Sequence, residues 1–356
     1  MNFMRNTWYA AVWAQDLPAD RLVPVTIIGE AVVLFRDAAG KATALLDRCP
    51  HRLVPLHLGR LCDGGARLQC GYHGLEFDGA GRCVRNPHSD RVPTAAKVRA
   101  FPVVERHSLI WVWMGDAAPC EAQIPDYSAF DECNNARVGR RETIELDVNY
   151  QLMTDNLLDL SHVSFLHDGI LGHADMVRGN IEVQQEDNTL YVRRATPNVA
   201  PPGMFDLMFR RDGQPVDVWA DMRWNAPASM LNYAGVCPPG GERSAGVHIL
   251  GAHILTPVSE FRTRYHVAAV RYDDTVTRSE EEASEVMQKL GDLRRHAFKD
   301  QDEPMVMAQQ DAMIRAGGLD AVEPLLLNID VGPARARRLL ETLRQQADEV
   351  REPVEA

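Results

Sequence analysis

The sequence predicts an α+β protein of two domains, a small antiparallel β domain over residues 1–124 and an antiparallel sheet with flanking helices over residues 125–356. Short β-branched and aromatic runs fill roughly the first 110 residues. Helical spacing first begins after Asp147, and a long amphipathic stretch begins near Ser279. A length of 356 residues also favours two domains over one.

Strand-like segments of the first domain alternate with turns. The predicted strands are residues 23–28, 32–35, 42–46, 101–104 and 109–113. The pairs Asp78-Gly79 and Ala80-Gly81 are typical turn sequences. Residues 119–136 are polar and are predicted to form a linker.

The second domain mixes both periodicities. Residues 147–167 have helical spacing, and residues 189–193, 229–236, 248–255 and 265–270 are strand-like. Ser279 and Glu282 fit a capping box that starts the next helix. Pro304 should kink or split this helix, and a last helix is predicted over residues 334–350.

Composition and charge exclude several classes of function. A net charge of -12 without a basic aromatic stripe argues against nucleic acid. No apolar run reaches the roughly 18 residues of a membrane helix, and residues 1–11 lack a secretion signal pattern. We therefore expect a cytoplasmic protein that binds no membrane. Seven cysteines, an odd number, favour metal binding or buried thiols over disulfides.

The strongest local pattern pairs cysteine with histidine twice. Cys49 and His51 are followed, after 18 residues, by Cys70 and His73. Two Cys and two His can hold zinc or a 2Fe-2S Rieske cluster. Zinc fingers usually keep like residues together, whereas each loop here carries one of each, which favours the Rieske cluster. A chance pairing in a β core is the third interpretation.

The remaining cysteines and nearby histidines lack such partners. Cys62, Cys83, Cys120, Cys133 and Cys237 have none at metal-ligand spacing and are interpreted as structural thiols. His57 and His88 are interpreted as loop residues.

A second pattern combines Asp159, His162 and His167. Two His and one carboxylate on one face of an iron ion leave positions open for O2 and substrate. The two His are five residues apart, which is about 140° around a regular helix. A break or a π-type bulge must therefore bring them together. Ordinary packing or surface histidines remain the alternative.

A third ligand must come from elsewhere in the chain. The segment at residues 298–304 offers Asp300 and Asp302. A solvated acidic helix face is the alternative, and spacing does not choose between these interpretations.

Together the two patterns resemble the Rieske non-heme iron ring-hydroxylating oxygenases, and more closely their single-subunit O-demethylase branch. The resemblance spans nearly the whole chain. Segments that carry it besides the metal motifs are residues 5–9, 71–77, 101–105, 110–113, 155–160 and 253–257. The 18-residue spacer is at the long end of the family pattern. The resemblance implies an N-terminal Rieske domain and a C-terminal catalytic domain of helix-grip type.

The resemblance also implies roles for matching residues. Cys49, His51, Cys70 and His73 would bind the 2Fe-2S cluster, and His162, His167 and Asp302 would bind a mononuclear non-heme Fe(II), with Asp300 as the weaker candidate. Asp159 would carry electrons from His73 of a neighbouring chain to His162, which implies a head-to-tail homotrimer. Asn232 and His253 would orient the substrate, although both also fit as core polar groups.

The implied activity is that of the terminal oxygenase component of a monooxygenase. A separate reductase or ferredoxin would supply electrons from NAD(P)H, and O2 and a small aromatic substrate would react at the iron. O-demethylation of a methoxylated aromatic acid with release of formaldehyde is the first expectation. Hydroxylation of an aryl methyl group or ring, and N-demethylation, are the alternatives. A zinc-stabilised binding protein and a pure electron carrier belong to other classes.

Overall fold

The structure is a computed structural model that describes residues 3–131, 137–271 and 279–349. The chain falls into two compact units. The first runs up to Asp126 and includes Thr256–Ser259; the second holds Tyr127–Leu255 and Glu260–Glu349. Cys133 and the predicted linker's Asn134 and Asn135 lie outside the described residues.

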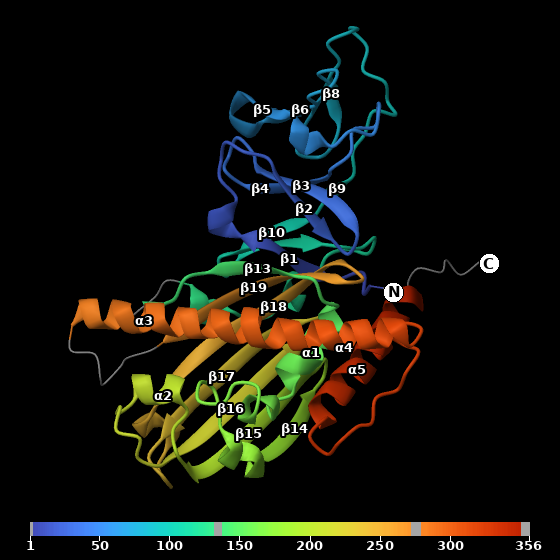
Figure 1. The fold of residues 1–356 in the computed structure, drawn as a ribbon. Coiled ribbons are helices and arrows are strands. Elements are labelled where there is room, and N and C mark those ends of the chain that lie inside the picture. Colours follow the sequence, from blue (N-terminus) through green and yellow to red (C-terminus); the bar gives the residue numbers. More distant parts are fainter. Residues whose placement is uncertain (1–2, 132–136, 272–278, 350–356) are drawn as a thin grey trace. The chain divides into compact units, whose positions relative to one another are not determined.

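Three antiparallel sheets build the first unit (Figure 1). One has the order β1 (Trp8–Trp13), β11 (Leu109–Trp113), β10 (Val103–Arg106), and the second has the order β2 (Val23–Ile27), β3 (Glu30–Arg36), β4 (Ala42–Leu46), β9 (Ala100–Phe101). The third has the order β5 (Arg60–Cys62), β6 (Arg67–Gln69), β7 (Glu76–Phe77), β8 (Cys83–Arg85). The predicted strand at residues 101–104 is interrupted at Pro102, which separates β9 from β10 into different sheets.

Strand β3 connects two hydrophobic cores of this unit. Val32 and Leu34 pack into one core, and Val33 and Phe35, which point to the opposite face, pack into the other. The second core also contains Cys49 and Cys70. Both cysteine loops are therefore fixed to the same rigid core.

An eight-stranded sheet forms the second unit. Its order is β12 (Arg137–Val138), β19 (Arg262–Arg271), β18 (Val247–Ser259), β17 (Ser229–Cys237), β16 (Val216–Asn225), β15 (Thr189–Val199), β14 (Asn180–Glu186), and β13 (Glu142–Leu146) also pairs with β19. Its helices are α1 (Tyr150–Leu158), α2 (Gly203–Met208), α3 (Glu280–Arg295), α4 (Glu303–Arg315) and α5 (Val331–Glu349). The predicted α+β class is confirmed.

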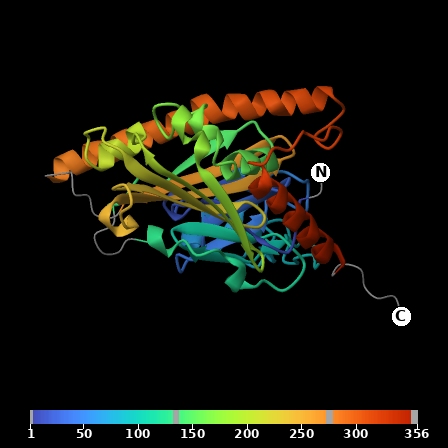
Figure 2. The ribbon, with the colours of Figure 1, turned by 90° about the horizontal axis from the view of Figure 1, so that it is seen from below.

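A long helical rod lies along one side of this sheet (Figures 1 and 2). It consists of α3, a π-helix at His296–Asp302, and α4. The Ser279 side chain accepts a hydrogen bond from the Glu282 amide at 3.2 Å, as the capping box predicts. Pro304 lies in the first turn of α4, where a missing amide hydrogen costs little, so the change of helix type precedes it.

Short 3₁₀ helices complete the described chain. They are Ala14–Asp16, Leu56–Leu58, Asp63–Gly65, Glu121–Gln123, Ser128–Phe130, His162–Ser164, Ala174–Arg178 and Arg243–Ala245. The described part of the predicted linker is packed rather than loose, because Ile124, Tyr127 and Phe130 are buried. Among the described helices none is both long and apolar enough to cross a membrane.

Candidate functional site

Two loops of the first unit present the predicted cluster ligands with the same backbone pattern. The Cys49 amide donates to the Val54 carbonyl at 2.9 Å, and the Cys70 amide donates to the Leu75 carbonyl at 2.8 Å. Each loop reverses four residues after its cysteine at a positive φ, of 60° at Leu53 and 74° at Gly74. The two loops therefore share one backbone pattern, although the histidine follows Cys49 by two residues and Cys70 by three.

The cysteines are buried and the histidines lie nearer the surface. Cys49 and Cys70 are each 2% exposed, and their side chains interact with each other. Burial raises the pKa of Cys49 to about 11, with a further contribution from Cys70. The rings of His51 and His73 are 4.5 Å apart. A bound iron–sulfur cluster would favour the thiolate form of both cysteines over the thiol. The donor set of two cysteines and two histidines fits a Rieske cluster.

The second predicted ligand pair lies where helix α1 ends. This helix stops at Leu158, and a 3₁₀ turn at His162–Ser164 replaces its continuation. The break brings the Nε2 atoms of His162 and His167 to 3.2 Å from each other. The predicted break is therefore present in the histidine segment, whereas the π-helix of this site lies in the segment that carries Asp302.

Asp302, in the π-helix, is the third predicted ligand and lies against both histidines. Its Oδ1 atom lies 3.5 Å from His162 Nε2 and 3.2 Å from His167 Nε2. Asp302 is 1% exposed, and within the described chain its Oδ2 atom has no hydrogen-bond partner. Asp300 instead is exposed and contacts His296 at 2.8 Å. The structure thus brings Asp302, and not Asp300, to the two histidines.

Hydrogen bonds at the far side of each ring set the histidine tautomers. His162 Nδ1 donates to the Asp159 carbonyl, and His167 Nδ1 donates to Gln301 Oε1 at 2.8 Å. Both Nε2 lone pairs and the Asp302 carboxylate then converge on one point. Two nitrogens at about 2.1 Å from a metal and at right angles are roughly 3 Å apart, which matches the observed spacing. The residues present fit a mononuclear metal ion.

The electrostatics of the three groups agree with this fit. Burial lowers the pKa of His162, although the charge of Asp302 opposes the change. Burial also disfavours a proton on His167, but its contact with Asp302 outweighs burial and raises the pKa of His167. At both histidines the charge of Asp302 favours a positive charge at this point, and burial opposes it.

Three supporting residues were not identified from the sequence. Gln301 orients His167, and Asn156 donates to Asp302 Oδ1 at 3.1 Å. Arg194 of β15 is 4% exposed and donates to the Leu160 carbonyl at 2.5 Å and to Ser164 Oγ at 3.0 Å. It also donates to the Met176 carbonyl. No spacing signal marks these contacts, because each joins segments distant in sequence.

Asp159 acts within this chain mainly through its backbone. Its carbonyl orients His162, while its carboxylate accepts hydrogen bonds from the Ser161 amide and hydroxyl at 2.9 and 2.5 Å. The predicted link from Asp159 to His162 is thus present through the backbone carbonyl, while the link to His73 of a neighbouring chain stays a prediction.

The predicted substrate residues lie on one face of the sheet. Asn232 is paired with Gly251, and Met230 with His253, so Asn232 and His253 are diagonal neighbours on that face. His253 Nδ1 hydrogen-bonds the Tyr265 hydroxyl at 2.5 Å, and burial lowers the pKa of His253 to about 3. Asn232 Oδ1 is buried without a partner among the described residues. His253 is therefore neutral and packed, whereas Asn232 can still accept a hydrogen bond.

A small cavity adjoins the histidine segment. This inner cavity of ≈ 80 Å³ is lined by Leu160 and Val163, which flank His162, and by Asn232 and Ala234 of β17. Its other walls are mostly apolar. Its volume suits a small alkyl group, and it lies against the segment that carries His162.

Comparison with known proteins identifies this arrangement. Residues 7–101 match the Rieske 2Fe-2S domain, and residues 146–346 match the vanillate O-demethylase oxygenase C-terminal domain. The dicamba O-demethylase oxygenase component of Stenotrophomonas maltophilia is 36% identical over 97% of this chain and 99% of its own length. The chain belongs to the Rieske non-heme iron oxygenase family.

Other relatives of this Rieske oxygenase extend the comparison. The chloroacetanilide N-alkylformylase oxygenase component of Rhizorhabdus wittichii (strain DC-6 / KACC 16600) is 34% identical over 96% of this chain and 95% of its own length. A crystal structure of dicamba monooxygenase bound to 3,6-dichlorosalicylic acid matches with a TM-score of 0.88 at 34% identity, over 98% of this chain and 99% of that one.

The family decides between the interpretations that the cysteine motif left open. This Rieske oxygenase is the terminal oxygenase component of a monooxygenase, and its cofactors are a 2Fe-2S Rieske cluster and a mononuclear non-heme iron. The zinc-stabilised binding protein and the pure electron carrier are thereby ruled out.

Proposed function

We propose that this oxygenase removes the methyl group of a methoxylated aromatic acid. The observation that carries the proposal is the convergence of His162 Nε2, His167 Nε2 and Asp302 Oδ1 beside a small, mainly apolar cavity. When bound there, iron would supply the oxidation of the methyl carbon by O2. The balanced reaction consumes the ether, O2, two electrons and two protons, and yields a phenol, formaldehyde and water.

The residues of the chain divide the work between holding and positioning. His162, His167 and Asp302 would hold the iron on one face, while Gln301, Asn156 and the Asp159 carbonyl keep the ligand atoms aimed at it. The apolar walls of the inner cavity exclude water from the reacting carbon. Asn232 would accept or donate a hydrogen bond to the substrate.

Electrons would enter through the first unit. Cys49, His51, Cys70 and His73 would hold the Rieske cluster, and a separate reductase or ferredoxin would reduce it. We further propose a head-to-tail homotrimer in which the Asp159 carboxylate of one chain meets His73 of the next. Within one chain, the Ser161 hydroxyl donates a hydrogen bond to the Asp159 carboxylate and keeps it oriented.

Product analysis tests the proposal. Holoenzyme, a compatible reductase and NADH are incubated with methoxybenzoates, and formaldehyde and the phenol are quantified against O2 consumed. We expect one formaldehyde per O2 in coupled turnover, and His162→Ala should abolish it with the EPR signal of the cluster retained. Hydroxylated products without formaldehyde would reject O-demethylation.

N-dealkylation is the second candidate. A relative that is 34% identical over nearly the whole chain is named as an N-alkylformylase. The same assay with N-alkylanilides in place of methoxybenzoates separates the two, because the amide product replaces the phenol.

A further inference from the structure

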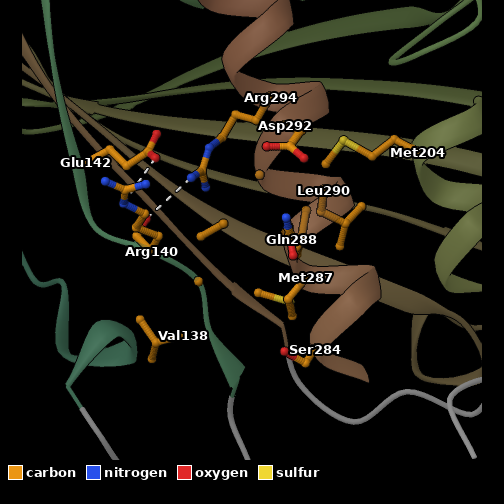
Figure 3. Close-up of a pocket in the computed structure, with 14 residues that line it drawn as sticks. Val138, Arg140, Glu142, Met204, Ser284, Met287, Gln288, Leu290, Asp292 and Arg294 are labelled. Carbon is orange, nitrogen blue, oxygen red and sulfur yellow. Dashed lines mark hydrogen bonds and ion pairs between the residues drawn. The ribbon is translucent and has the colours of Figure 1, made fainter. Parts of the chain in front are cut away.

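A second and larger cavity lies between helix α3 and the sheet, and we call it the outer cavity (Figure 3). Its volume is ≈ 430 Å³, within the range of sites for small organic molecules. One part of its wall is apolar and another is charged: Met204, Ile249, Ala269 and Leu290 form the first, and Arg140, Glu142 and Arg294 form the second.

The carboxylate of the charged wall, Glu142, pairs with arginines other than Arg294. Glu142 Oε1 lies 3.0 Å from Arg295 and 3.5 Å from Arg140. Arg294 makes only a 3.5 Å hydrogen bond to the Arg140 carbonyl (Figure 3), and no ion pair with any described residue. Asp292 also lines the cavity but is exposed, where water screens its charge. Of the two arginines in the wall, Arg294 thus lacks an ion pair among the described residues.

Arg294 is well placed to bind an anion. Burial lowers its pKa, with the charge of Glu142 opposing the change, so the guanidinium is partly removed from water without a close counter-ion. A guanidinium has five N–H donors, and a charge that is buried without an ion pair is costly. An anionic ligand would relieve this cost.

The outer cavity adjoins the inner one across two neighbouring strands. Ile249 lines the outer cavity, Ala234 lines the inner cavity, and these residues are directly paired between β17 and β18. Directly paired residues have Cβ atoms about 5 Å apart. The two cavities are therefore neighbours on the same face of the sheet.

Cavity size restricts which part of a substrate can enter each cavity. A cavity of roughly 150 Å³ is known to hold one benzene, and the inner cavity has only ≈ 80 Å³. An aromatic ring does not fit there, although an alkyl group does. The outer cavity is large enough for a ring and its charged substituent.

We propose that the outer cavity binds the body of the substrate, an apolar organic carboxylate or sulfonate, with Arg294 as its anion contact, while only the alkyl group to be oxidised enters the inner cavity. This inference rests on the proposed function and assigns the charge recognition to Arg294 instead of His253, which is neutral and already bonded to Tyr265.

Equilibrium binding tests this assignment. Titration calorimetry of the holoenzyme, without reductase, compares para-methoxybenzoate, para-toluenesulfonate and the neutral para-methoxybenzamide. The wild type should bind both anions about 10- to 100-fold more tightly than the amide, because a hydrogen bond to a charged group is strong. Arg294→Gln should remove that preference and leave amide binding unchanged, and Arg294→Lys should retain part of it.

Arg295→Gln is the matched control, since it removes the same charge from the adjacent residue, which ion-pairs with Glu142 outside the cavity lining. It should keep the anion preference. The inference is overturned if the wild type binds the amide as tightly as the anions or binds none of the probes. It is also overturned if Arg294→Gln keeps the preference, or if Arg295→Gln loses it equally.

Two further arms keep the result decisive. If Arg294→Gln does not retain the cluster and the iron, Arg294→Lys is measured in its place. An anion affinity of Arg294→Lys equal to that of the wild type would contradict a contact with the guanidinium. Because binding is measured without electrons, absence of demethylation in the product assay would reject the proposed function and leave this result standing.

Discussion

Arg194→Met is expected to weaken iron binding without disturbing the Rieske cluster. Arg194 donates to acceptors on both sides of His162, the Leu160 carbonyl and Ser164 Oγ, and to the Met176 carbonyl. Methionine is long enough to fill most of the space and cannot donate. The two buried carbonyls would each lose a donor at a cost of about 1–3 kcal/mol, or about 2–6 kcal/mol together.

Only part of that free energy would be lost from iron binding. The segment around His162 can relax, and the substitution also removes the cost of burying the Arg194 charge. Burial lowers the pKa of Arg194, with Asp159 opposing the change, so the guanidinium is itself held at some cost. About 1.4–2.8 kcal/mol at the site corresponds to 10- to 100-fold weaker iron binding, as is usual when ligand-orienting contacts are removed.

The assay is iron retention during dialysis against graded concentrations of an Fe(II) chelator, with the cluster followed separately by EPR. Arg193→Met is the control, because Arg193 lies next in sequence on the opposite face of β15 and contacts Gln184 at 2.8 Å. It should bind iron as the wild type does. Equal iron affinity in Arg194→Met and wild type would refute the positioning role.

Three other substitutions test separate parts of the account. Gln301→Leu removes the acceptor for His167 Nδ1, so iron binding should weaken about 10- to 100-fold; unchanged retention would contradict that role. His253→Asn should make the stability of the fold depend less on pH in the acid range. Burial lowers the pKa of His253 to about 3, so the unfolded chain binds an extra proton between about pH 6.5 and 3, and the wild type loses stability as the pH falls through that window. An unchanged slope of Tm against pH in the variant would contradict this prediction. Arg337→Met breaks the pair between Arg337 of α5 and Asp155 of α1, which share contacts at 2.8 and 3.0 Å, and should cost about 1–3 kcal/mol, seen as a lower Tm; no change would show that α5 is not held by this pair.

Sequence patterns predicted a strand or helix well where the period of its apolar residues agrees with the burial of those residues. The predicted strands at residues 42–46 and 109–113 match β4 and β11 residue for residue, because both are short, apolar and bounded by turns. Strands β14 and β16 were not predicted. In β14 mostly exposed polar residues leave little apolar alternation, and in β16 buried Val218, Trp219 and Trp224 alternate irregularly with charged residues.

Long-range geometry was less accessible than the ligand types. Spacing predicted that the His162 segment must break, but it could not choose between Asp300 and Asp302, which differ by only two residues. The π-helix decides the direction of each: Asp302 points inward and is buried, and Asp300 points to solvent. Arg294 and Arg194 likewise look like ordinary arginines in the sequence, because their roles depend on what surrounds them in the fold: Arg194 donates to buried backbone carbonyls, and Arg294 has no ion pair among the described residues.

The most direct test of the central claim is the metal content of one purified chain, compared between the wild type and Asp302→Asn. The wild type should contain about three irons, two of them with acid-labile sulfide, and Asp302→Asn should keep the two cluster irons and lose most of the third. Zinc in place of iron, or a third iron that binds Asp302→Asn as tightly as the wild type, would contradict a site built from His162, His167 and Asp302.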